Sequence, residues 1–171
     1  MMNKIIFIDT ETGGVNAEKS ALIQLSGIIE VDGTEKEKFN FYIKPFENSE
    51  INERALEVQG RTFEELRTDK YIDESIVYKK FLEILDKYID KYDKDDKFIV
   101  AGYNVKFDID ILKALFERNN NKFLFSYFNS SMLDPLYSVR LLQVAGMLPV
   151  LENNKLETWC KHFGIELKAH D

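Results

Sequence analysis

Residues 4–14 of the chain read KIIFIDTETGG, and this stretch decides the fold. Residues 5–8 form an apolar run without alternation, which predicts a β-strand over residues 4–9 that is buried on both faces. Asp9 stands at the end of this run, and because strand side chains alternate, Asp9 and Glu11 are expected to point to the same side. Two carboxylates projected together from a core strand repel each other and lose hydration, so a bound cation is the simplest compensation. An interpretation without a ligand stays open, in which Asp9 caps the following turn and Glu11 points to water.

A third carboxylate lies on the apolar face of a later helix. Residues 98–101 (FIVA) predict another buried strand, and a helix is expected over residues 107–117. Asp108 falls on the apolar stripe of this helix, near its start. If the two buried strands are neighbours, Asp108 converges with Asp9 and Glu11 at one edge of the sheet, where ligand sites of open α/β sheets gather. The alternative is that Asp108 only complements the positive end of the helix dipole.

The remaining elements follow from periodicity and turn signals. A hairpin is predicted around Asp32-Gly33, and an amphipathic helix of about five turns is predicted over residues 75–92. Shorter segments predict strands at 22–31, 39–43 and 127–133, and helices at 52–58, 135–144 (with Asp134 as N-cap) and 155–163 (with Gly164 as C-cap). This order predicts a single α/β domain over residues 1–171, with a mixed sheet covered by helices.

The composition argues against several classes of protein. The chain has 171 residues, 44% of them hydrophobic and 31% charged, which suits one ordinary globular domain and not a disordered or fibrous chain. The formal net charge of −7 argues against a protein that holds nucleic acid by charge alone. The single cysteine, Cys160, cannot form an internal disulfide, and no apolar run approaches the roughly 20 residues that cross a bilayer. We therefore expect a soluble, cytoplasmic protein without a membrane partner.

The chemistry of the three carboxylates points to a class of reaction. An all-oxygen ligand set suits Mg²⁺ or Mn²⁺, whereas a Zn²⁺ site would be expected to contain Cys and His. Paired hard cations, roughly 3.5–4 Å apart between carboxylates, typically serve phosphoryl transfer. Such cations also change an acidic pocket from one that repels a phosphate into one that attracts it.

Four segments, in order, resemble the motifs of the DEDD 3′–5′ exonucleases. Residues 8–14 (IDTETGG) resemble the first motif, Asp-x-Glu-Thr-Thr-Gly, and residues 104–112 (NVKFDIDIL) resemble the second, Asn-x-x-Phe-Asp-x-x-x-Leu. Between them, residues 55–62 (ALEVQGRT) are similar to a segment that often contains Val-His-Gly-Ile-Thr. Residues 163–165 (FGI) and 169–171 (AHD) resemble the approach to the third motif of the His-containing DEDDh branch. Proofreading epsilon subunits of bacterial DNA polymerase III are the members most similar in pattern.

The resemblance implies an RNase H-like fold and a role for each matching residue. It implies two divalent cations, Mg²⁺ or Mn²⁺, and the residues expected to hold them are Asp9, Glu11 and Asp108. Glu11 and His170 are the implied catalytic residues, with His170 as the general base that takes a proton from the attacking water. The expected contacts of the terminal nucleotide are Thr12, Gly13, Asn104 and Phe107. Backbone N–H groups near Thr12 and Gly13 are the expected donors. Phe107 is expected either to pack under the terminal sugar or to fill the core, and filling the core is the favoured role.

The resemblance has two departures. The position before Asn104 is often His in this family and is Tyr103 here, which we expect to be tolerated. The larger departure is at the end of the chain. In the DEDDh pattern a fourth metal-binding Asp follows the His by five residues on a final helix, whereas this chain stops at Asp171, one residue after His170. We expect that the final helix is lacking because the chain is truncated. A natural variant with an incomplete site is one alternative. In the other, Asp171 substitutes for the missing Asp, although chain ends fray.

The resemblance also implies an activity and its partners. We expect metal-dependent 3′–5′ hydrolysis of the terminal phosphodiester of DNA, with release of nucleoside 5′-monophosphates, as in proofreading. The expected substrate is a single-stranded or frayed 3′ end of DNA or RNA, and a DNA polymerase subunit is the candidate protein partner. Two alternatives stay open. One is an exoribonuclease that trims RNA or oligonucleotides, and the other is a non-catalytic binding module that keeps the fold but lacks the fourth carboxylate.

Overall fold

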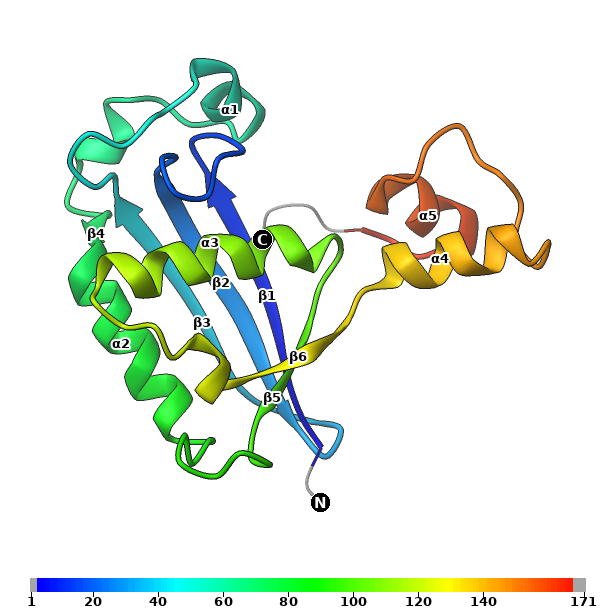
Figure 1. Cartoon of the computed structure of the whole chain (residues 1–171). Helices are drawn as coiled ribbons and strands as arrows, with labels where there is room; N and C mark the ends of the chain where they lie inside the picture. Colours follow the sequence, from blue (N-terminus) through cyan, green and yellow to red (C-terminus); the bar gives the residue numbers. More distant parts are fainter. Residues whose placement is uncertain (1–2, 168–171) are drawn as a thin grey trace. The chain divides into compact units, whose positions relative to one another are not determined.

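A computed structural model describes residues 3–167, and the chain divides into two compact units between Leu133 and Asp134 (Figure 1). The first unit contains all the strands of the described chain and the helices α1, α2 and α3. The second unit contains α4 and α5. The candidate residues that lie within the described chain all belong to the first unit.

A six-stranded mixed sheet is the frame of the first unit, in the order β4-β3-β2-β1-β5-β6. The strands are β1 (Lys4–Thr12), β2 (Leu22–Val31), β3 (Thr34–Lys44), β4 (Ile72–Asp73), β5 (Phe98–Ala101) and β6 (Phe128–Leu133). β1 pairs antiparallel with β2 and parallel with β5, with Ile6 opposite Val100. The prediction that β1 and β5 are neighbours is confirmed. The prediction that β1 is buried on both faces is wrong: Ile6 and Ile8 are buried under the helices, whereas Phe7, on the other face, is 41% exposed. The hairpin turn between β2 and β3 is also where expected, with positive φ at Asp32 (50°) and Gly33 (73°).

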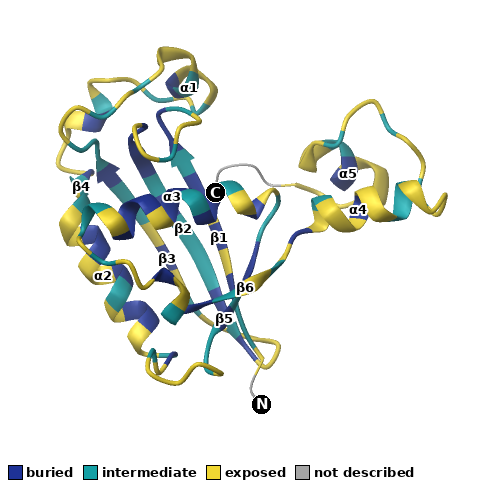
Figure 2. Ribbon diagram, in the orientation of Figure 1, coloured by how far each residue is buried: buried dark blue, intermediate teal, exposed yellow. Residues whose placement is uncertain are grey.

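Two long helices, α2 (Glu74–Asp86) and α3 (Val105–Arg118), cover one face of this sheet (Figures 1 and 2). Aromatic side chains pack in this core: Phe81 of α2 contacts Phe39 of β3, with ring centroids 5.4 Å apart, and Tyr78 of α2 contacts Phe116 of α3, with ring centroids 5.2 Å apart. The apolar side chains of β1 that face the helices are fully buried, because they lie in the middle of this core. The expected α/β architecture, a mixed sheet flanked by helices, is confirmed.

A smaller cluster packs at the end of the opposite sheet face. It is formed by α1 (Glu53–Val58) and the 3₁₀ turn η1 (Glu65–Arg67), which place Leu56, Leu66 and Tyr71 against Tyr42 of β3. Asn52 starts α1, because its side chain accepts a hydrogen bond from the Arg54 N–H. The segment therefore covers the edge of the sheet where β1 and β3 end.

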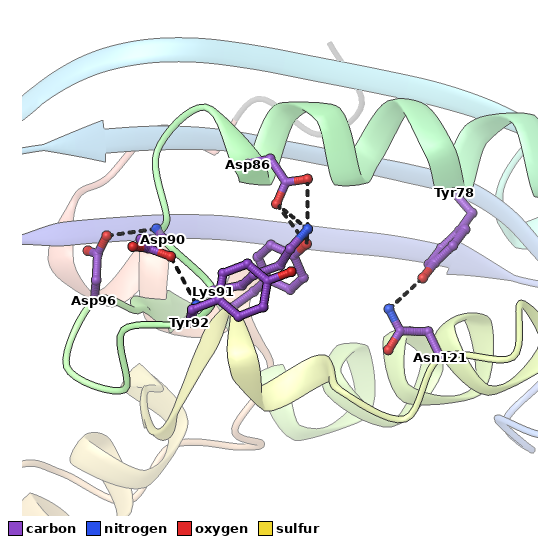
Figure 3. Close-up of polar contacts among 8 residues, drawn as sticks. Tyr78, Asp86, Asp90, Lys91, Tyr92, Asp96 and Asn121 are labelled. Carbon is purple, nitrogen blue, oxygen red and sulfur yellow. Dashed lines mark hydrogen bonds and ion pairs between the residues drawn. The ribbon is translucent and has the colours of Figure 1, made fainter.

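The α2 helix ends at Asp86, six residues earlier than the periodicity predicts. The polar residues that follow bond to one another and to neighbouring elements instead of continuing the helix (Figure 3). Lys91 Nζ lies 3.1 Å from Asp86 Oδ1 and donates to the Tyr127 hydroxyl at 3.2 Å, and Asp96 Oδ2 accepts from the Asp90 N–H at 2.9 Å. Such side chain-to-backbone bonds compete with helix formation. β4 and the 3₁₀ turns η1 and η2 (Leu124–Ser126) are too short to give a periodic signal.

The second unit consists of α4 (Pro135–Val144) and α5 (Leu156–Phe163). Asp134 caps α4 as expected, since its Oδ1 accepts from the Leu136 N–H at 2.9 Å, and Pro135 takes the first helical position. Gly164 ends α5 in the left-handed region, with φ of 67°. No helix within residues 3–167 is long and apolar enough to cross a membrane.

Candidate active site

The candidate site begins where β5 stops and β1 continues. β5 ends at Ala101, opposite Phe7, but β1 runs on to Thr12. Three residues past Phe7, the Thr10 N–H meets α3, and it donates to Asp108 Oδ1 at 3.0 Å. The Thr10 hydroxyl donates to the same oxygen at 2.7 Å. Two hydrogen bonds from one strand residue therefore fix the carboxylate of Asp108 at the end of β1.

Asp108 is a buried acid, with only 7% of its surface exposed. Burial raises the pKa of its carboxyl group from 3.8 to about 6, the charge of Asp9 contributes in the same direction, and the hydrogen bonds from Thr10 oppose the shift. Asp9 thus lies close enough for its charge to act on Asp108. Perturbed carboxyl groups of this kind concentrate at functional sites, although ion-pair networks also produce them.

Asp9 and Glu11 lie on the sheet face opposite the helices. Thr10, between them, is buried on the helix-covered face, whereas Asp9 is exposed and Glu11 half-buried. The pair reaches the end of β1 from one side and Asp108 reaches it from α3. Within residues 3–167, no three His, Cys, Asp or Glu side chains form a group that holds a metal ion. The structure therefore brings Asp9 and Asp108 together, while Glu11 does not complete a three-residue group with them.

The donor chemistry at this position fits a hard cation. Carboxylate oxygens are the ligands that Mg²⁺ and Mn²⁺ prefer. Both hydrogen bonds from Thr10 end on Oδ1 of Asp108, so Thr10 does not engage Oδ2. A cation beside Asp9 and Asp108 would offset their mutual repulsion, which contributes to the raised pKa of Asp108. The roles of Asp9, Glu11 and Asp108 as metal ligands stay a prediction.

The turn after β1 is tightly packed against the segment that precedes α1. The Thr12 hydroxyl donates to the Gly14 carbonyl at 2.6 Å, and the Gly13 N–H donates to the Ala21 carbonyl at 2.7 Å. A Cβ atom on Gly13 would lie 2.8 Å from the Glu50 carbonyl oxygen, so only a glycine fits this approach without a backbone shift. Because the Gly13 N–H is already bonded within the protein, it is not available as the expected donor to the terminal nucleotide. A contact of the nucleotide with Thr12 or with another atom of Gly13 stays a prediction.

The other expected substrate contacts lie at the start of α3. Asn104 is the exposed residue before the helix and adopts a left-handed conformation, with φ of 61°. Phe107 is half-buried against the core and also lines a cavity of about 470 Å³, together with Val15 and Lys113. Phe107 therefore packs in the core and faces an open space as well. His170 and Asp171 lie outside the described residues.

Sequence reasoning missed two residues that organise this site. The role of Thr10 could have been found from the sequence. Alternation of side chains along the strand places Thr10 on the core face between two outward-pointing acids, and a buried hydroxyl needs a hydrogen-bond partner. Gln59 lies where the similar exonuclease segment often has His, and its Nε2 donates to the Thr12 carbonyl at 2.9 Å. No pattern in a single sequence predicts this contact across 47 residues.

Comparison with known proteins places the chain among exonucleases. A family model described as exonuclease, RNase_T, matches residues 6–171. The DNA polymerase III PolC-type of Pediococcus pentosaceus is 26% identical over 167 residues, which are 98% of this chain and 10% of the polymerase. The ribonuclease T of Photorhabdus laumondii is 31% identical over 123 residues, which are 68% of this chain and 55% of that enzyme. The chain thus spans about a tenth of the polymerase and about half of the ribonuclease.

Solved structures show the same fold. A product-bound structure of exonuclease I superposes with a TM-score of 0.80 at 22% identity, over 99% of this chain and 40% of that one. Exonuclease I of E. coli in complex with a dT13 oligonucleotide gives a TM-score of 0.76 at 23% identity, over 96% of this chain and 36% of that one. The sheet order, the Asp-x-Glu pair at the end of β1, the buried Asp108 and the family match together give one conclusion: this chain belongs to the exonuclease family.

Proposed function

We propose that this chain is a metal-dependent 3′–5′ exonuclease domain that hydrolyses the terminal phosphodiester of a single-stranded or frayed DNA end. The products are nucleoside 5′-monophosphates and a strand shortened by one nucleotide. One observation carries the proposal: in a chain of the exonuclease family, Thr10 fixes the buried carboxylate of Asp108 beside Asp9 at the end of the central strand.

The residues proposed to hold two divalent cations, Mg²⁺ or Mn²⁺, are Asp9, Glu11 and Asp108. When bound, the cations supply charge that stabilises the attacking and leaving oxygens of an in-line displacement. The chain's own contribution is to hold the acids in place: Thr10 orients Asp108, and the β1 backbone carries Asp9 and Glu11. His170, which lies outside the described residues, is the proposed general base for the attacking water. One structure of E. coli exonuclease I with single-stranded DNA contains a zinc ion, so a metal is bound in that protein.

RNA is a second candidate substrate, because ribonuclease T of Buchnera aphidicola is 32% identical over 141 residues, 77% of this chain. The similarity to PolC-type polymerases supports DNA as substrate and a polymerase as partner, as in proofreading. Discrimination between DNA and RNA depends on contacts with the 2′-OH. Cytoplasmic location stays a prediction from the sequence.

The test is release of mononucleotides from single-stranded dT and U oligonucleotides in the presence of Mn²⁺ or Mg²⁺. Asp9→Ala and Asp108→Asn are expected to lower the rate by at least about 100-fold, as for other preorganised charged groups. Asp108→Asn keeps an Oδ1 that can accept both bonds from Thr10, so the fold is preserved. Asp95→Asn is the matched control, since Asp95 is exposed in the loop before the opposite end of β5.

Three outcomes separate the alternatives. Metal-dependent release by the parent and by Asp95→Asn, lost in both site variants, supports the proposal. Release from U but not dT favours the exoribonuclease. A folded parent that binds oligonucleotides without cutting them under any metal condition contradicts the proposal and favours the binding module.

A further inference from the structure

The sheet face that carries Asp9 and Glu11 continues as a polar surface across β2 and β3. Cross-strand pairing places the side chains in two rows on this face: Glu11, Gln24 and Tyr42 in one, and Asp9, Ser26 and Asn40 in the other. Gln24 Nε2 donates to Asn40 Oδ1 at 2.8 Å, and this contact is exposed. The face is therefore equipped with hydrogen-bonding groups beside the candidate acids, unlike the apolar face under α2 and α3.

Arg61 reaches over this face from the segment after α1. Its Nη2 donates to Gln24 Oε1, and its guanidinium carbon lies 5.5 Å from the centroid of the Tyr42 ring. The remaining terminal nitrogen, Nη1, is buried and has no hydrogen-bond partner in the described part of the chain. A guanidinium group has five N–H donors and matches phosphate geometry, so Arg61 has an unused donor. Because Nη1 is buried, an anion reaches it only when the Arg61 side chain turns toward solvent.

A second cationic side chain, that of Lys70, lies over the ring of Tyr42. Lys70 Nζ lies 4.0 Å from the Tyr42 ring centroid and 3.1 Å from Glu65 Oε1. Its side chain is 47% exposed, so the pair with Glu65 is screened by solvent. We call Arg61, Lys70 and Tyr42, with Gln24 and Asn40 beneath them, the Tyr42 patch. It combines two cations and an aromatic ring, with one acid beside them, in a chain whose overall charge is −7.

The position of the Tyr42 patch relative to the candidate acids is fixed by Gln59. Gln59 Nε2 donates to the Thr12 carbonyl, and Gln59 precedes Arg61 by two residues. Gln24, which Arg61 contacts, is the direct cross-strand partner of Glu11. Adjacent strands lie about 4.8 Å apart, so the step from β1 to β3 is about 10 Å. That distance corresponds to about three nucleotides if the strand is stacked with a rise of about 3.4 Å each, and to fewer if the strand is extended.

We propose that the Tyr42 patch binds the phosphodiester backbone of the single strand within about three nucleotides upstream of the scissile bond. The inference rests on the proposed function and names a part of the substrate path that lies outside the candidate acids. Sequence-tolerant binding of single strands combines basic side chains along the backbone with aromatic side chains. Because phosphates are common to DNA and RNA, the patch serves both equally.

The experiment compares steady-state kinetics of the parent, Arg61→Gln, Lys70→Gln and the double variant on three substrates. These are a dT decamer, a U decamer, and p-nitrophenyl thymidine 5′-phosphate, which has no upstream phosphate. For both decamers each single substitution is expected to raise KM about tenfold with kcat unchanged. The slope of log kcat/KM against log salt concentration is negative, and it is expected to become about 0.7 less negative for each lost phosphate contact. Hydrolysis of the small ester is expected to stay at the parent's rate.

Lys79→Gln is the matched control. Lys79 is exposed on α2, which covers the other face of the sheet, so the same change of net charge is made away from the patch. Lys70 is exposed, so its variant tests the proposal even if Arg61→Gln lowers thermal stability.

The proposal is overturned if Lys70→Gln and Arg61→Gln keep the parent's KM and salt slope on both decamers. It is also overturned if their changes in KM and in salt slope are no larger than those of Lys79→Gln. An effect on one decamer alone contradicts backbone recognition and indicates contact with the sugar or base. If the parent hydrolyses neither the decamers nor the small ester, the proposed function has failed, and binding of uncut decamers at varied salt still tests the patch.

Discussion

At the scale of single residues, two features of Asp108 favour the neutral form of its carboxyl group when no metal is bound. Its carboxyl group is buried, which favours the neutral form, and it lies beside Asp9, whose charge favours it further. Thr10 opposes both effects with its two hydrogen bonds, yet the pKa remains raised at about 6. At neutral pH the ionised Asp108 is therefore a source of instability that a bound cation can remove.

The raised pKa of Asp108 predicts how the stability of the protein depends on pH in the absence of metal. Between the unfolded value of 3.8 and the folded value of about 6, the folded protein holds more protons on Asp108 than the unfolded chain does. The free energy of unfolding contributed by this group therefore falls as the pH rises through that window, by about 3 kcal/mol in total. Asp108→Asn is expected to be more stable than the parent at pH 7 and to differ little from it at pH 4.

Urea unfolding in EDTA, for parent and variant at several pH values, measures this difference. Other carboxyl groups, such as those of Glu65 and Asp96 with lowered pKa, titrate in both proteins and cancel in the comparison. A difference that stays constant from pH 4 to pH 7 would show that Asp108 is not perturbed.

At the scale of elements, the turns around the sheet differ in what they require of a glycine. Gly33 in the β2–β3 turn has φ of 73°, and a Cβ atom at this position would meet no atom of the described chain within 4 Å, so only backbone strain opposes a substitution. Gly13 lies against the Glu50 carbonyl, and its own carbonyl accepts from the Asn52 N–H at 2.7 Å. A shift at Gly13 therefore moves both Thr12 and the start of α1.

We expect Gly33→Ala to lower stability by about 1–2 kcal/mol and leave nucleotide release unchanged. Gly13→Ala is expected to lower stability by about 1–3 kcal/mol and also to reduce the rate of release, because the end of β1 moves. Urea unfolding and the oligonucleotide assay on the same preparations check both. Equal activity of the two variants would mean that the Gly13 turn does not position the site.

Elements also show how far a sequence predicts this structure. The core-facing residues of β1, the strand β5 and the stripes of α2 and α3 were predictable, because burial favours apolar residues there. The apolar run of β1 wrongly predicted burial of its second face, where Phe7 is 41% exposed. The hairpin at Asp32-Gly33 and the Asp134-Pro135 helix start were confirmed, since these residues have strong local preferences. The predicted end of α2 was wrong because the charged residues that follow keep a helical spacing but bond to one another and to Tyr127. The position of Thr10 and Gln59 at the site depends on contacts across 98 and 47 residues, which no local pattern encodes.

At the scale of the whole molecule, the proposed cations couple the site to global stability. A ligand that binds only the folded state raises the free energy of unfolding by RT ln(1 + [L]/Kd), about 2.7 kcal/mol at a hundredfold excess over Kd. Mn²⁺ is therefore expected to raise the melting temperature of the parent and of Asp95→Asn, and to raise that of Asp9→Asn and Asp108→Asn much less. Differential scanning fluorimetry with and without Mn²⁺ measures the shift in each protein. An equal shift in all four would place the ion away from these acids.

The central position of β1 in the sheet has a consequence for how the candidate site responds to partial unfolding. β1 has a paired strand on each side, β2 along its length and β5 over residues 5–7, whereas β4 and β6 are the outermost strands. Partial opening of a protein starts at its least protected segments. Fraying of the periphery therefore leaves Asp9 and Thr10 paired with β2, and the end of β1 that carries the candidate acids separates only when the centre of the sheet opens.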